Sequence, residues 1–271
     1  MVRTTPTGQL APRFERHSPV SGDPLYEFST FRSFRALVGV DGIARRERIA
    51  FDLLIAPTRG RGSHEVDFQT THLDRNHWLY VRAGQVHRWG PVTYEADLVV
   101  LQPVTGAAHW QPGPHRITFT DPQLAELRPL LDFAKVDRTN PDPVVMEVTR
   151  DLLFEWLQRG ATQHKQNPLH AGFQNLLELH VVDMRSVDDY AVILGVTKRE
   201  LADACRSAGG RHPQKMIDDA LLLEAKRLFA QSNATVPAVA SFLGFDTHSF
   251  DKFFRRAEGQ RLDRWLSANL T

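Results

Sequence analysis

The spacing of hydrophobic residues in the last 85 positions predicts a pair of short helices, and the same pattern returns 49 positions later. The shared apolar and glycine positions are Val187, Ala191, Leu194, Gly195, Leu201 and Cys205 in the first copy, and Val236, Ala240, Leu243, Gly244, Phe250 and Phe254 in the second. A glycine after the last apolar residue of a helix favours a left-handed turn. Each copy therefore predicts a helix-turn-helix.

Capping residues support the same reading. Thr197 with Glu200 predicts a capping box at the second helix of the first copy. In the second copy, Thr235 and Asp246 are predicted to cap the two helices. Between the copies, apolar pairs recur every four residues from Pro213 to Gln231, which predicts one helix of about 19 residues and roughly 28 Å. Successive major grooves lie roughly 34 Å apart, so this rod suits two DNA-reading helices.

The second helix of each copy is the predicted reader. Its buried side is expected to be Leu201, Ala204 and Cys205 in one copy and Phe250, Phe253 and Phe254 in the other. The predicted DNA-binding residues are Lys198, Arg199, Ala202, Asp203, Arg206, Thr247, His248, Ser249, Lys252, Arg255 and Arg256. Arg255 and Arg256 are expected at phosphates, and Thr247, His248 and Lys252 at base edges.

The first half of the chain has the pattern of β-structure. From about residue 24 to 120, apolar runs such as 51–56, 78–81 and 98–101 alternate with the clusters 58–62 and 89–91, which predict turns. Many short strands with Gly and Pro between them favour a small barrel or a sandwich. Residues 1–23 are expected to form a flexible tail.

From Asp121 the spacing becomes helical. Leu124, Leu127, Leu130 and Leu131 form one stripe, and further segments start after Asp142 and Asn167. One of these stripes is a candidate dimer seam, for which we choose Val145, Val148, Leu152 and Trp156. Packing entirely within the monomer is the alternative.

Composition adds limits. The net charge is only +1, so the prediction of DNA binding rests on pattern rather than on charge. A single helix-turn-helix pattern also fits any helical hairpin, and it is the repetition that favours DNA. One cysteine, Cys205, permits no disulfide within the chain, and no apolar run is long enough for a membrane span. We expect a cytoplasmic protein without a membrane partner or a cofactor.

The last 85 residues resemble the double helix-turn-helix domain of AraC/XylS-type transcriptional regulators. The resemblance is carried by 190–191, 194–196, the Glu-Ala-Lys-Arg-Leu stretch 224–228, 243–245, and the Lys-Phe-Phe-Arg-Arg stretch 252–256 with Gly259. The chain departs from the family in three places. The turn after Phe245 is one residue shorter, Asp203 stands where many members have a basic residue, and Leu262 replaces the usual Pro.

The resemblance implies an α+β multidomain protein: a cupin-like β-barrel that binds a small-molecule effector, a helical dimerisation segment, and an all-α DNA-binding domain. We expect a barrel over 24–120, a linker over 121–184 and a DNA-binding domain over 185–271. The implied partners are double-stranded DNA, an effector, a second copy of the chain and possible contact with RNA polymerase. Activation and repression both stay open, and no enzymatic activity is expected.

Four histidines, His64, His72, His77 and His87, fall within 24 residues of the barrel. They lack the H-x-H spacing of metal cupins, so we assign no metal. The predicted effector site is His64, Trp78, His87 and Trp89, because imidazoles orient polar groups and indoles stack on flat ligands. Three alternatives stay open: histidines that bond only the barrel's own backbone, a metal-dependent cupin enzyme, and a DNA-binding factor whose barrel takes no ligand.

Overall fold

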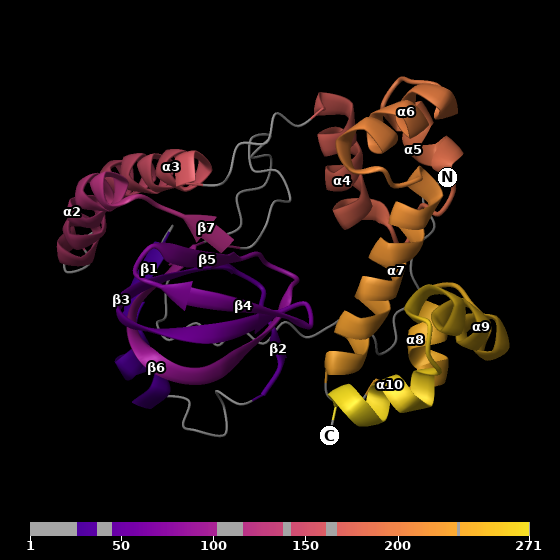
Figure 1. The fold of residues 1–271 in the computed structure, drawn as a ribbon, viewed down its shortest axis with the longest axis horizontal. Helices are drawn as coiled ribbons and strands as arrows, with labels where there is room; N and C mark the ends of the chain where they lie inside the picture. Colours follow the sequence, from indigo (N-terminus) through magenta and orange to yellow (C-terminus); the bar gives the residue numbers. More distant parts are fainter. Residues whose placement is uncertain are drawn as a thin grey trace.

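The computed structural model describes residues 26–36, 45–101, 116–137, 142–160, 167–231 and 234–270. The predicted tail, 1–23, lies outside these residues. The first half is an antiparallel seven-stranded sheet, curved into a half-barrel, with strand order β1-β6-β3-β4-β5-β7 and β2 paired to β6 (Figure 1). The strands are β1 (Tyr26–Thr30), β2 (Glu47–Arg48), β3 (Asp52–Val66), β4 (Gln69–Asp74), β5 (His77–Val81), β6 (Val86–Leu101) and β7 (Arg116–Thr118). The predicted barrel-like β-domain is confirmed.

Two of the predicted turns are wrong. Residues 58–62 lie inside β3 and residues 89–91 lie inside β6, and these long strands pair with each other along most of their length. The pairing passes through two irregularities, because the register shifts between Pro57 and Arg59 and again between Gly62 and His64. Between them, Gly60 takes a left-handed φ of 79°. A Cβ on Gly90 would stand 2.3 Å from the Ser63 hydroxyl oxygen, so the strands approach too closely there for any side chain.

The two faces of the sheet carry separate cores. The concave side gathers residues such as Ile55, Val66, Leu79 and Trp89. The other side is covered by α2 (Asp121–Asp137) and α3 (Pro143–Gly160), whose buried residues include Leu124, Leu127, Leu131, Leu153 and Leu157. The helical stripe predicted from Asp121 therefore faces the sheet.

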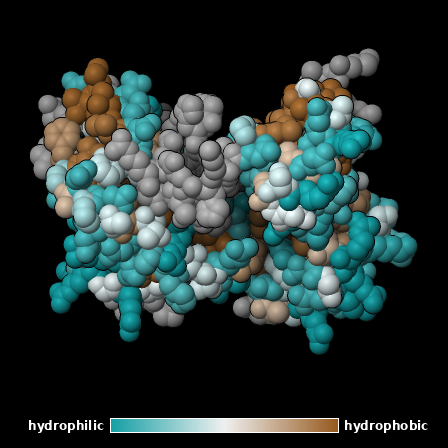
Figure 2. Space-filling view, turned by 45° about the horizontal axis from the view of Figure 1, so that its top comes forward, coloured by the Kyte–Doolittle hydropathy of each residue, from teal (hydrophilic) through white to brown (hydrophobic). Residues whose placement is uncertain are grey.

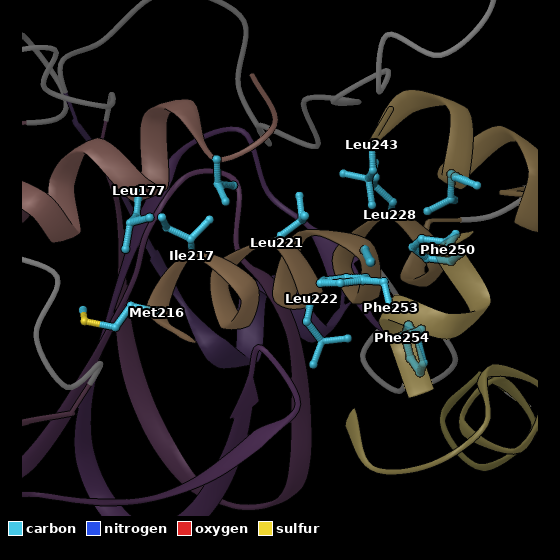
Figure 3. Packing of buried hydrophobic residues seen from close by; sticks show 14 of the residues in the cluster. Leu177, Met216, Ile217, Leu221, Leu222, Leu228, Leu243, Phe250, Phe253 and Phe254 are labelled. Atoms are coloured by element: carbon cyan, nitrogen blue, oxygen red, sulfur yellow. The ribbon is translucent and has the colours of Figure 1, made fainter. Parts of the chain in front are cut away.

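The helices from residue 168 onward form a second body on the other side of the molecule (Figure 1). They are α4 (Pro168–His180), α5 (Val187–Ile193), α6 (Lys198–Gly209), α7 (Pro213–Ala230), α8 (Val236–Phe242), α9 (Thr247–Glu258) and α10 (Leu262–Asn269). The predicted connecting helix is α7. Its residues Ile217, Leu221 and Leu228 form the centre of the core, with α4 against its first half and α9 against its second (Figure 3).

Helix α4 belongs to this second body, although its residues fall within the predicted linker. Phe173 and Leu177 of α4 are buried in the same core as α5 to α10. The Phe173 ring meets the edge of Tyr190, with 5.2 Å between centroids. Within the described ranges, no helix has the length and apolar content of a membrane span.

Candidate nucleic-acid interface

The two helix-turn-helix units repeat in structure as they do in sequence. Helices α5 and α6 begin and end at positions that return 49 residues later as α8 and α9. The turn glycines are left-handed in both units, with φ of 67° at Gly195 and 65° at Gly244. The glycines that end the readers, Gly210 and Gly259, are left-handed too. The two turns therefore have the same length.

Side-chain caps fix where each reader begins. Thr197 and Glu200 form the predicted capping box at α6, and Asp246 accepts from the backbone N–H of Ser249 at α9. Ser186 caps α5 in the same way. Thr235 occupies the predicted cap position of α8, but its side chain forms no capping hydrogen bond. The predicted position is therefore right and the predicted hydrogen bond is wrong.

The readers are anchored by different residues. Leu201, Ala204 and Cys205 bury one side of α6, while Phe250, Phe253 and Phe254 bury one side of α9. The phenylalanine cluster extends to Phe229 of α7 and to Phe245 in the turn, with ring centroids 5.1 to 6.4 Å apart. Because this buries one side of each helix, the other side is left for a ligand.

The predicted DNA-binding residues all lie on α6 or α9. Ala202 is half-buried and the other ten are exposed. Three of the basic side chains pair with local carboxylates: Lys198 with Asp188 at 2.6 Å, Arg206 with Asp203 at 3.1 Å, and Arg256 with Asp218 at 3.5 Å. Arg199, Lys252 and Arg255 form no ion pair with any residue that the structure describes.

Arg185 ties the two units together, a role that no sequence pattern indicates. From the segment before α5, its guanidinium donates to the carbonyls of Leu243 and Gly244 in the second turn. It also lies 4.8 Å from the centroid of the Phe245 ring. A Cβ on Gly244 would lie 2.6 Å from this guanidinium, so a side chain at this position would displace Arg185. The start of the first unit is thus in direct contact with the turn of the second unit.

The predicted effector residues divide between the two faces of the sheet. His64 and His87 are buried inside the half-barrel, with 2.9 Å between His64 Nε2 and His87 Nδ1. The edge of Trp89 meets His64 at 4.6 Å between centroids. Trp78 lies on the opposite face, against Phe119, and its indole N–H donates to a backbone carbonyl. The structure brings three of the four residues together and leaves Trp78 in a structural position.

The histidine pair is electrically neutral near pH 7. Burial, and secondarily the neighbouring His87, hold the pKa of His64 well below its usual value, and burial lowers the pKa of His87 to about 4. Two buried polar atoms on this side of the sheet, His64 Nδ1 and the Tyr94 hydroxyl, have no hydrogen-bond partner within the described part of the chain. Buried polar atoms in proteins normally form hydrogen bonds, so we expect each of these two atoms to have a hydrogen-bond partner outside the described residues.

The donors that a metal-dependent cupin needs do not converge in the described residues, since no group of three or more His, Cys, Asp or Glu side chains is placed to hold an ion there. His77 bonds Asp74 at 2.7 Å, and His72 is exposed on β4.

The two helix-turn-helix units, α5–α6 and α8–α9, are joined by the single helix α7, which is the arrangement of a double helix-turn-helix protein. A family model described as a helix-turn-helix domain matches residues 190–268. The predicted helix-turn-helix domain at the end of the chain is thereby confirmed, in agreement with the resemblance to AraC/XylS-type transcriptional regulators.

Several proteins are similar to most of the chain at low sequence identity. The uncharacterized HTH-type transcriptional regulator YobQ of Bacillus subtilis is 22% identical over 214 residues, which cover 78% of this chain and 83% of that protein. Unsaturated fatty acid-bound ToxT from Vibrio cholerae superposes with a TM-score of 0.42 at 10% identity, covering 90% and 92% of the two chains. The AraC-like transcriptional activator CuxR superposes with a TM-score of 0.32 at 12% identity, covering 74% and 73%.

Proposed function

We propose that this protein is a one-component transcriptional regulator of the AraC/XylS type, which binds duplex DNA through α6 and α9. The observation that carries this proposal is the repeat, at a constant interval, of two capped reader helices whose polar faces are exposed. Arg199, Lys252 and Arg255 are the cations available for DNA, because their charges are not neutralised by a carboxylate among the described residues. Asp203 forms an ion pair with Arg206 and reduces the charge of the first reader.

The test is a fluorescence anisotropy titration with the duplex upstream of the protein's own gene and a scrambled duplex, at several salt concentrations. We expect tighter binding to the upstream duplex, with the preference reduced at particular base pairs in Arg199→Ala. Arg264→Ala is the matched control, because Arg264 is exposed on α10 and lies on neither reader. Equal affinity for both duplexes would contradict the proposal.

The effector of this regulator is proposed to bind beside His64, His87 and Trp89. Two neutral imidazoles and aromatic rings, without a fixed positive charge on these three residues, suit an uncharged, flat molecule with a hydroxyl or carbonyl group. A carboxylate would find no counter-charge on these three residues, which is unfavourable in a desolvated interior.

Thermal shift measurements separate this proposal from a barrel without a ligand. The probes are aromatic alcohols and aldehydes together with the benzoate of the same ring. We expect stabilisation by uncharged probes, its loss in His64→Leu, and its persistence in His77→Ala, where the changed histidine is half-buried on β5. A ligand at 100 times its dissociation constant adds about 2.7 kcal/mol. Stabilisation by benzoate alone would contradict the chemical class.

A homodimer is proposed through α2 and α3. Their outer surface exposes Phe133, Val144, Val148 and Leu152 by between 46 and 69%, and Figure 2 shows an apolar surface at this end of the molecule. Of the predicted seam, Val148 and Leu152 are exposed, Val145 is half-buried, and Trp156 packs against the core. Sedimentation of Val148→Glu/Leu152→Glu should show a monomer where the parent chain shows a dimer.

Contact with RNA polymerase stays a prediction.

A further inference from the structure

The barrel and the DNA-binding domain meet at the tip of the β3–β4 hairpin. Asp67 and Phe68 form its two-residue loop, between the paired residues Val66 and Gln69, with φ of 48° and 66°. Such loops normally carry Asn-Gly, because both residues must be left-handed. A phenylalanine there is strained, and strain of this kind persists only where surrounding contacts fix it.

Those contacts come from the other domain. The Phe68 ring meets the buried Trp265 of α10 edge to face, with 5.2 Å between centroids. The Arg46 guanidinium lies 5.3 Å from the centroid of the Phe68 ring and also donates to the carbonyl of Asn269, at the end of α10. Phe68 thus joins the edge of the DNA-binding domain's core.

Beside this aromatic contact, two arginine–carboxylate pairs cross the interface in opposite directions. Arg227 of α7 donates through Nε and Nη2 to the two Asp67 carboxylate oxygens, at 2.8 and 2.6 Å. Arg48 of β2 donates through Nη1 and Nη2 to the two oxygens of Glu224, at 2.8 and 3.1 Å. All four side chains are at most 14% exposed.

Because these two pairs are buried, breaking either of them is expected to weaken the contact between the domains. Charged, bidentate hydrogen bonds are strong, and removing one partner of a buried pair leaves a charge without compensation. Glu224 and Arg227 lie one turn apart on α7 and are also 3.6 Å from each other, so the two pairs form one network. By contrast, the pair of Arg82 and Glu178 at the rim is about one-third exposed on each side and contributes little.

The same strands carry the histidine pair. Val66 pairs with His87 in the β3–β6 register, and His64 precedes Asp67 by three residues on β3. The Asp67 carboxylate also accepts from the backbone N–H of Val86 at 3.2 Å. A ligand that moves either histidine strand therefore moves the carboxylate that holds Arg227.

We propose that Arg48, Asp67, Phe68, Glu224 and Arg227 form an interdomain latch, which couples occupancy of the histidine site to DNA binding. The reader residues are exposed while the latch is closed. The latch therefore acts by fixing the orientation of the barrel relative to the readers, rather than by covering them. The coupling to DNA rests on the proposed function, whereas the docking of the two domains does not.

The test uses the full chain in small-angle X-ray scattering. Glu224→Arg places a third cation beside Arg48 and Arg227 and should open the latch, which increases the radius of gyration at unchanged circular dichroism. Arg48→Glu/Glu224→Arg restores the charge balance and should restore the radius. Glu95→Arg changes the net charge equally at an exposed site on β6 and should have no effect. If Glu224→Arg does not fold, Arg48→Gln gives the same readout more mildly.

DNA affinity is then measured for the same variants with a random-sequence duplex. An allosteric coupling of ordinary size changes the dissociation constant at least about fivefold in Glu224→Arg relative to Glu95→Arg, and the double variant reverses the change. An unchanged radius of gyration overturns the latch. A changed radius with the affinity of Glu95→Arg overturns the coupling. If the parent chain binds no DNA, the proposed function fails, and the scattering still decides whether the latch exists.

Discussion

The two helix-turn-helix units share every helix boundary at an interval of 49 residues, yet they are stabilised differently. The first unit packs small residues, Ala204 and Cys205, beneath its reader. The second packs three phenylalanines beneath its own. Charge differs as well: Arg206 pairs with Asp203, whereas Arg255, at the equivalent position, forms no ion pair with a described residue.

The difference shows that backbone geometry and side-chain energetics are specified by separate positions. Glycines and caps set the boundaries in both units, because left-handed φ and N-terminal hydrogen bonds are local requirements. Stability depends on what lies beneath the reader. Affinity for phosphate depends on which cations are left without a local carboxylate. The second unit thus combines the larger apolar anchor with the less neutralised reader.

The largest contrast is expected from truncating the equivalent anchors Phe254 and Cys205, both fully buried. Phe254→Ala should lower the free energy of unfolding by about 3–5 kcal/mol, because it removes a whole ring from a packed cluster. Cys205→Ala removes one sulfur and should lower it by about 1 kcal/mol. Urea unfolding followed by circular dichroism measures both. Equal losses would show that the two cores are equally dependent on their anchors.

The turn glycines should differ by a smaller amount. Both are left-handed, so alanine at either position is strained by about 1–2 kcal/mol. A methyl group on Gly195 would meet no other atom within 4 Å, whereas one on Gly244 would displace the Arg185 guanidinium. Gly244→Ala should therefore lose about 1 kcal/mol more than Gly195→Ala, the value of a typical lost hydrogen bond. Urea unfolding gives both values, and the same loss in the background Arg185→Ala would remove the contribution assigned to Arg185.

Much of this domain is predictable from sequence because its determinants are local. The left-handed turns at Gly195 and Gly244, the Asp246 cap and the buried sides of both readers follow from spacing alone. The contacts of Arg185 with Leu243 and Gly244 do not, since they join residues 58 or more positions apart without a periodic signal.

The barrel is less predictable from sequence, because its structure depends on contacts between residues far apart in the chain. Residues 58–62 have turn composition, but pairing with β6 holds them in a strand, so tertiary contact overrides local preference. Trp78 is predicted from sequence to share a site with the histidines because an indole can stack on a flat ligand. The alternation of side chains along β5 instead places it on the opposite face of the sheet. The Asp67–Arg227 pair joins residues 160 positions apart, and nothing in the composition of either segment indicates it.

Equivalent arginines on the two readers should differ in their contribution to DNA binding. Each phosphate contact contributes about 0.9 to the slope of log affinity against log salt. Arg255→Ala should lower this slope by about one contact, whereas Arg206→Ala should lower it less, because Asp203 already neutralises part of its charge. Anisotropy titrations over a series of salt concentrations give both slopes. A larger effect of Arg206→Ala would place the stronger phosphate contact on the first unit.

The smallest contrast concerns the caps of the first helices, Ser186 of α5 and Thr235 of α8. The Ser186 hydroxyl accepts from the backbone N–H of Asp189 at 3.2 Å, whereas Thr235 makes no such bond. Ser186→Ala should therefore lower the free energy of unfolding by about 1 kcal/mol, and Thr235→Ala by a few tenths at most. Pro237 in the first turn of α8 already lacks an N–H and reduces the need for a cap there. Urea midpoints that move equally in the two variants would mean that the Thr235 hydroxyl caps α8 in solution.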